Sequence, residues 1–149
     1  MIALPVELLS LNLECNNIEE SGLRNLCSAL TSPSIKLQHL SLSNNFLHYS
    51  GCKTLVASLI ENTSLRTLGL AQNFIKDQGA ECIGFLLGLE TCLLEEINLS
   101  DNFICAKGAY AIYSIFESGD NRNIKKVDLR KNEIHELTSL FKNYNSINH

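Results

Sequence analysis

A segment of the form Leu-x-x-Leu-x-Leu-x-x-Asn-x-Leu, with isoleucine or valine at some of the leucine positions, occurs five times along the chain. The five copies begin near residues 8, 37, 65, 94 and 124, so they follow one another at intervals of 28 to 30 residues. A period of this length is typical of proteins that stack one supersecondary unit on the next. The sequence therefore predicts a solenoid whose units share one continuous core.

Each copy predicts a short strand that ends in a turn. In the Leu-x-Leu core, apolar residues alternate with variable ones, so one side of the strand faces inward and the other outward. The side-chain amide of the asparagine that follows both donates and accepts hydrogen bonds, and it can pair with backbone groups that the turn leaves free. We therefore expect a buried asparagine ladder, formed by Asn16, Asn45, Asn73, Asn102 and Asn132.

A helix is predicted after each of the first four copies. A glycine lies four residues after the last apolar position, at Gly22, Gly51, Gly79 and Gly108. Apolar residues then recur at helical spacing and are expected to face the strands: Leu23, Leu26, Cys27 and Leu30; Cys52, Leu55, Val56 and Leu59; Ala80, Ile83 and Leu87; Ala109, Ile112 and Phe116. Residues 136–144 predict a closing helix, with an apolar stripe of Leu137, Leu140, Phe141 and Tyr144.

The repeat pattern and the glycines resemble those of the leucine-rich repeat family, in its ribonuclease-inhibitor-like class. The resemblance extends over the whole chain, which we interpret as one domain over residues 1–149. It implies an α/β solenoid in the form of a horseshoe arc, with parallel strands on the concave face and helices on the convex face. We expect the first repeat to be covered by a preceding segment or by another subunit.

The outward-facing side chains of the strands are the predicted binding surface, because a rigid sheet holds them in fixed positions. In four of the five repeats the central outward position is uncharged, whereas the last strand is strongly charged. The residues expected to contact a partner are Asn12, Glu14, His39, Ser41, Ser43, Arg66, Thr67, Gln72, Glu96, Asn98, Asp101, Lys126, Asp128 and Arg130.

The basic residues of the fifth repeat allow two interpretations. Lys125, Lys126, Arg130 and Lys131 are able to form a patch for an acidic partner or a phosphate group. Alternatively, three of them pair with carboxylates of the preceding strand, because opposite charges on neighbouring strands attract one another. The expected pairs are Glu95 with Lys125, Glu96 with Lys126 and Asp101 with Lys131.

A column of phenylalanines follows the ladder asparagine in the three central repeats, at Phe46, Phe74 and Phe103. These rings either anchor a partner, since aromatic residues are frequent at binding hot spots, or stack on one another as a spine. We favour the spine.

Several classes of function are disfavoured by the sequence. The formal net charge of −4 gives no basic footprint for nucleic acid, and no apolar stretch reaches the length of a membrane span. The six cysteines form no CxxC pair and no zinc-type spacing with histidine, so we expect free thiols that pack as small apolar groups. No phosphate-binding loop and no catalytic Cys-His arrangement stand out, and we expect neither a cofactor nor enzymatic activity.

The leading hypothesis is a non-catalytic module that binds a partner protein through its concave strand face. The family that this chain resembles includes receptor-type sensors of innate immunity and translocated bacterial effectors. We therefore expect the chain to act in the cytoplasm. If it is an effector, this is the cytoplasm of a host cell. The alternatives are a regulator that resembles the Ran-type GTPase activators, and a structural segment of a larger leucine-rich repeat protein.

Overall fold

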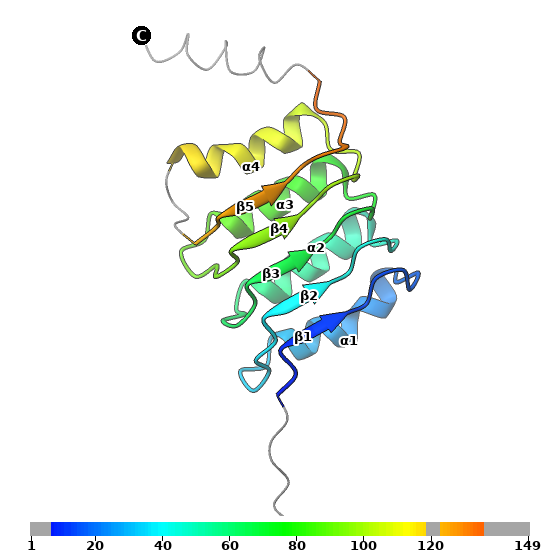
Figure 1. Cartoon of the computed structure of the whole chain (residues 1–149), viewed down its shortest axis with the longest axis vertical. Helices are drawn as coiled ribbons and strands as arrows, with labels where there is room; N and C mark the ends of the chain where they lie inside the picture. The colour runs from blue at the N-terminus through cyan, green and yellow to red at the C-terminus, as the bar shows by residue number, and fades with distance from the viewer. Residues whose placement is uncertain (1–6, 119–122, 136–149) are drawn as a thin grey trace, which may run out of the picture.

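The computed structural model describes residues 7–118 and 123–135. Five strands form one parallel sheet in chain order, and four helices form a second layer behind it (Figure 1). The strands are β1 (Ser10–Asn12), β2 (His39–Ser41), β3 (Thr67–Gly69), β4 (Glu96–Asn98) and β5 (Lys126–Asp128). The helices are α1 (Glu20–Leu30), α2 (His48–Leu59), α3 (Lys76–Leu87) and α4 (Ala106–Ser118). The predicted solenoid is thereby confirmed, while the predicted closing helix lies outside the described residues.

The sheet has the same register at every strand pair. Leu11 pairs with Leu40, Leu40 with Leu68, and Leu68 with Ile97. The fifth strand continues this row with Val127. The variable positions on either side of this row therefore form two straight columns on the opposite face of the sheet, because side chains alternate along a strand.

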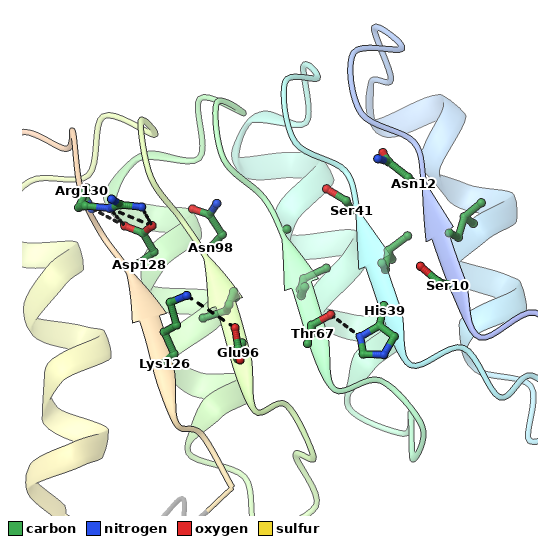
Figure 2. Close-up of a pocket in the computed structure, with 15 residues that line it drawn as sticks. Ser10, Asn12, His39, Ser41, Thr67, Glu96, Asn98, Lys126, Asp128 and Arg130 are labelled. Carbon is green, nitrogen blue, oxygen red and sulfur yellow. Dashed lines mark hydrogen bonds and ion pairs between the residues drawn. The ribbon is translucent and has the colours of Figure 1, made fainter.

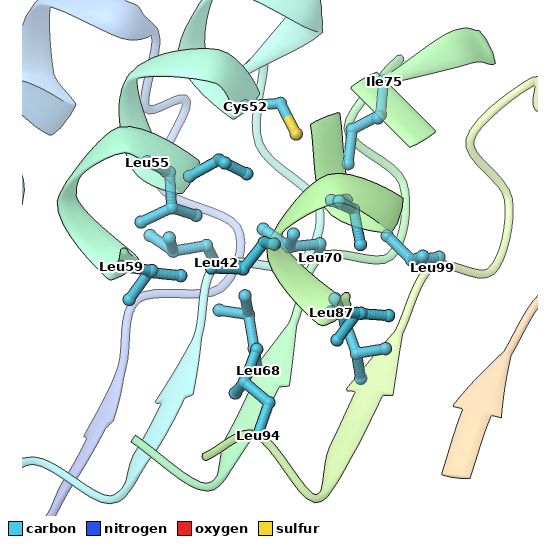
Figure 3. Packing of buried hydrophobic residues seen from close by; sticks show 14 of the residues in the cluster. Leu42, Cys52, Leu55, Leu59, Leu68, Leu70, Ile75, Leu87, Leu94 and Leu99 are labelled. Carbon is cyan, nitrogen blue, oxygen red and sulfur yellow. The ribbon is translucent and has the colours of Figure 1, made fainter. Parts of the chain in front are cut away.

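The core lies between the sheet and the helices and is built from the predicted stripes (Figure 3). Leu42, Leu70 and Leu99 enter it from the strand side, and none of the three is exposed to solvent. The predicted stripe is wrong at Phe116, which was expected to face the strands but is 45% exposed. It lies on α4, and no further helix packs on the outer flank of α4 in the described part of the chain.

Gly108 is the repeated glycine that allows two neighbouring repeats to approach most closely. A Cβ atom added at Gly108 would lie 2.8 Å from the Cα atom of Asp77 and 2.9 Å from the Cβ atom of Ala80. At Gly79 an added Cβ atom would instead meet the side chain of Ile75 in its own repeat, and the nearest atom of the neighbouring repeat is the Sγ atom of Cys52 at 3.4 Å. The contacts at Gly108 are tighter than a real side chain tolerates, so this glycine sets the distance between α3 and α4.

The ladder asparagines are aligned from repeat to repeat, and the three central ones are buried. The side-chain NH2 of Asn102 donates to the carbonyl oxygens of Leu70 at 2.8 Å and Leu99 at 3.1 Å. Its side-chain oxygen accepts from the backbone N–H of Asn73 at 2.9 Å. Each buried asparagine thus joins the strand ends of two repeats. Asn16, in the first repeat, is exposed and donates to the carbonyl oxygen of Glu14.

All six cysteines have free thiols, and three of them, Cys27, Cys52 and Cys92, are buried. Burial raises the pKa of the Cys52 thiol to about 12, because the apolar surroundings disfavour the thiolate.

Within the described residues, no helix has both the length and the apolar character needed to cross a membrane.

Candidate interaction surface on the strand face

An open groove of about 420 Å³ crosses the outward face of all five strands (Figure 2). We call it the strand-face groove. Nine of the predicted contact residues line it: Asn12, His39, Ser41, Thr67, Glu96, Asn98, Lys126, Asp128 and Arg130. Ser10 and Gly69 also line it and were not among the predicted contact residues, although their place in the two outward columns could have identified them.

The other predicted contact residues lie around the groove instead of lining it: Glu14, Ser43, Arg66, Gln72 and Asp101. Arg66 precedes β3 on the side where the chain enters the sheet. Gln72 and Asp101 lie in the turns beyond the strand ends, both in the left-handed backbone region with φ of 55° and 57°. Neither Gln72 nor Asp101 lines the groove.

The N-terminal half of the groove is formed mainly by hydroxyl and amide groups. A ring nitrogen of His39, Nδ1, lies 2.8 Å from the hydroxyl oxygen of Thr67 on the next strand. The hydroxyl of Ser41 donates to a carboxylate oxygen of Glu14 at the edge of the groove. This half therefore offers short, neutral hydrogen-bonding groups to a ligand.

The C-terminal half carries the charges. Nε and Nη2 of Arg130 donate to the carboxylate of Asp128, with the shortest distance at 2.6 Å. These hydrogen bonds, together with one from the backbone N–H of Arg130, lower the pKa of Asp128 from its ordinary value to about 2. Nζ of Lys126 lies 3.8 Å from a carboxylate oxygen of Glu96 on the neighbouring strand.

A second set of charges lies where the chain enters the sheet. Nζ of Lys125 lies 2.6 Å from a carboxylate oxygen of Glu95, and Nε of Arg66 lies 3.9 Å from the other oxygen. The hydrogen bond from Lys125 and the nearby positive charges hold the pKa of Glu95 below its ordinary value. Two of the three predicted cross-strand pairs are therefore present.

The third predicted pair is wrong. The carboxylate of Asp101 accepts a hydrogen bond from the side-chain amide of Gln72 at 3.0 Å, and Asp101 and Lys131 form no ion pair among the described residues. Both residues lie in left-handed turn positions, with φ of 57° and 58°, so the flat cross-strand geometry that we assumed does not extend to them.

The central column of the groove has oriented amides. The side-chain oxygens of Asn12 and Asn98 each accept a hydrogen bond from the backbone N–H two residues further on, at 2.9 and 3.0 Å. Their oxygens are thereby fixed, and across residues 7–118 and 123–135 no hydrogen bond engages either NH2 group. Both groups remain available as donors to a ligand carbonyl or carboxylate.

Comparison with known proteins agrees with this architecture. Family models described as leucine-rich repeats match residues 8–27, 61–84 and 36–59. The human NACHT, LRR and PYD domains-containing protein 13 is 31% identical over 121 residues, which cover 81% of this chain and 11% of the relative. The pig ribonuclease inhibitor is 36% identical over 96 residues, or 64% of this chain and 21% of the relative. The chain is a leucine-rich repeat protein of the ribonuclease-inhibitor-like class.

This leucine-rich repeat chain spans only a small part of its relatives. A third one, the mouse NACHT, LRR and PYD domains-containing protein 14, is 28% identical over 127 residues, which make up 85% of this chain and 13% of the relative. Similarity of this extent concerns the repeat region alone, so the activity of a whole relative does not transfer to the chain.

The phenylalanine column of this repeat protein forms a stack, as the spine interpretation predicts. The ring centroids of Phe46 and Phe74 are 6.1 Å apart with an interplanar angle of 12°, and those of Phe74 and Phe103 are 5.5 Å apart with an angle of 14°. The rings are nevertheless 37–42% exposed, so their outer edges meet solvent at the strand exits.

Among the described residues, no cluster of three or more histidine, cysteine or acidic side chains is arranged to hold a metal ion.

Proposed function

We propose that this chain is a non-catalytic protein-interaction module that binds a partner protein through the strand-face groove. The observation that carries the proposal is the groove itself, since side chains from five strands in constant register form one continuous polar surface. The pig relative supports it, because by its name it acts on a ribonuclease, which is itself a protein.

The distribution of charge supports a protein over a nucleic acid as the partner. Lys126 and Arg130, the two cations that line the groove, each face a carboxylate of the chain. A surface that binds phosphates needs uncompensated cations. A groove with donors, acceptors and paired charges instead matches the polar, hydrogen-bonded surface of a protein.

The sequence-based alternatives remain predictions. They are a bacterial effector, a receptor-type domain, a regulator resembling the Ran-type GTPase activators, and a structural segment of a larger protein. The GTPase alternative has its own test: the chain would have to accelerate GTP hydrolysis in a panel of small GTPases. We further propose that the module acts inside cells.

The test is affinity capture from eukaryotic cytosol with three baits: the native chain, an Asn98→Arg variant in the groove, and a Gln78→Arg variant on α3. The two variants add the same charge on opposite sides of the solenoid, and circular dichroism checks that both fold. We expect a protein that the native and Gln78→Arg chains retain and the Asn98→Arg chain loses. Equal retention by all three baits would place the binding site outside the groove.

A further inference from the structure

The guanidinium of Arg130, at the C-terminal end of the strand-face groove, is held along one edge and free along another. Nε and Nη2 donate to the carboxylate of Asp128, so this pair occupies the edge that these two nitrogens form. Within residues 7–118 and 123–135, Nη1 donates to no group. A guanidinium has its N–H donors in one rigid plane. The edge formed by Nη1 and the second N–H of Nη2 therefore offers two parallel donors.

Asp128 fixes the position of this free edge. The Asp128 side chain is only 10% exposed, whereas that of Arg130 is 84% exposed. Both carboxylate oxygens of Asp128 accept hydrogen bonds from Arg130, and one of them also accepts from its backbone N–H at 3.0 Å. The acceptors of the pair are thereby occupied, and the groups that it turns towards solvent are donors.

A further donor lies on the neighbouring strand. Asn98 of β4 pairs with Asp128 of β5 in the register of the sheet. Figure 2 shows Asn98 beside the Arg130–Asp128 pair, and all three side chains line the groove. The Oδ1 atom of Asn98 accepts from the backbone N–H of Ser100, so the NH2 group is the free end of this amide.

We infer that Arg130 and Asn98 bind the side-chain carboxylate of an aspartate or glutamate on the partner protein. This assignment rests on the proposed function of the strand-face groove, because it names the partner group that one end of the groove receives. The site presents N–H donors, so its ligand has to supply acceptors. A carboxylate matches a guanidinium edge with two parallel hydrogen bonds and contacts the positive group directly. Because Asp128 compensates the charge, the site suits one carboxylate better than a row of phosphates.

The opposite end of the groove contains the same amide without the arginine. The Oδ1 atom of Asn12 accepts from the backbone N–H of Glu14, so its NH2 group is free as in Asn98. No arginine lines the groove on β1 or β2, and the Glu14 carboxylate lies at this end, where it accepts from the hydroxyl of Ser41. A ligand carboxylate would meet a like charge there. Asn12 is therefore an internal control for Asn98.

The test is an NMR titration of the isotope-labelled native chain with the blocked peptide acetyl-Gly-Glu-Gly-amide. We expect saturable shifts of the Asn98 NH2 and Arg130 Nε–H signals and no saturable shift of the Asn12 NH2 signals. Acetyl-Gly-Gln-Gly-amide differs only in lacking the charge and should shift none of them saturably. Absence of saturable shifts with the glutamate peptide, or equal shifts with the glutamine peptide or with sodium chloride at the same ionic strength, overturns the inference.

A chain end is the competing source of a carboxylate. Acetyl-Gly-Gln-Gly with a free C-terminal carboxyl group carries its only charge there, and we expect it to bind more weakly than the glutamate peptide. Tighter binding of this peptide would overturn the assignment to a side chain.

Three variants test the geometry. Arg130→Gln should weaken binding of the glutamate peptide at least about tenfold, because hydrogen bonds between charged groups are lost. Arg130→Lys keeps the charge without the two parallel donors and should also weaken it, whereas native affinity in this variant would exclude the paired contact. Arg24→Gln removes an exposed arginine that lies beside Glu20 on α1, outside the groove, and should bind like the native chain.

The titration and the affinity capture fail independently. If a protein is captured through the groove while the glutamate peptide does not bind, the carboxylate site is wrong and the proposed function stands. If the peptide binds while all three baits retain the same proteins, the site is correct and the proposed function is wrong.

Discussion

The side-chain oxygen of Asn102 accepts a hydrogen bond from the backbone N–H of Asn73, which lies 29 residues earlier in the chain. One side chain thereby holds the turn of the repeat before its own. The same side chain donates to two carbonyl oxygens, so a single amide satisfies backbone groups in two repeats. The ladder thus connects the repeats by polar contacts that run alongside the apolar core.

We expect Asn73→Ala to destabilise the fold strongly. The NH2 group of Asn73 donates to the carbonyl oxygen of Leu42 at 2.9 Å and also to two carbonyls of its own turn, and the residue is fully buried. Its loss leaves buried carbonyls unpaired, which costs about 3 kcal/mol. Asn16→Ala, in the exposed first turn, should cost about 0.5 kcal/mol or less. Urea denaturation measures the free energy of unfolding of both variants. Equal losses of this free energy would contradict the role of burial.

The repeated glycines should differ sharply in their tolerance of alanine. At Gly108 the added methyl group meets Asp77 and Ala80 within 3 Å, so Gly108→Ala should destabilise the fold by about 2 kcal/mol. At Gly22 the nearest atom is the Cγ2 of Ile18 at 3.5 Å, and alanine there should stabilise α1 by about 0.5 kcal/mol. Thermal unfolding of the two variants checks the difference in sign.

The Asp128 carboxyl should titrate near pH 2 in the folded chain. Because its folded-state pKa lies below the ordinary value of 3.8, its contact with Arg130 stabilises the fold above that value. This stabilisation disappears as the pH falls towards about 2. Carbon-detected NMR titration measures the pKa directly, and Arg130→Gln should return it towards the ordinary value. An unchanged pKa in that variant would exclude Arg130 as the cause.

The thiols should react in an order set by their burial. Cys15 is exposed in the first turn and should react readily with Ellman's reagent in the native chain. Cys52 is fully buried, and its raised pKa of about 12 leaves almost no thiolate at neutral pH. It should react only after denaturation. Mass spectrometry of the modified peptides distinguishes the two, and early labelling of Cys52 would show local opening at α2.

The repeat sequence was sufficient to predict the strand register and the core, because both depend on apolar periodicity. Leu40 and Leu68 had to pair once the repeats were aligned, and they do. The course of the turns could not be predicted this way. Gln72 and Asp101 adopt left-handed backbone conformations, which depend on hydrogen bonds to the next repeat and not on hydrophobic pattern.

The sequence pattern also could not predict which helix side chains are exposed to solvent. Phe116 matches Leu87 of the previous repeat in position, yet Leu87 is buried and Phe116 is exposed. The two residues differ because α4 packs beside α3, whereas no helix in the described part of the chain packs on the outer flank of α4. The groove on the helical face between α2 and α3 has the same origin, because its shape depends on how two helices meet and not on either one alone.

The order of the strands in the sheet is the order of the chain, and each helix contacts the helices before and after it. A molecule of this kind can unravel from either end, one unit at a time, while the rest keeps its structure. The amide hydrogens of β3, in the middle repeat, should therefore exchange with solvent more slowly than those of β1 and β5. The outer repeats can adapt to a bound surface while the middle of the arc stays rigid.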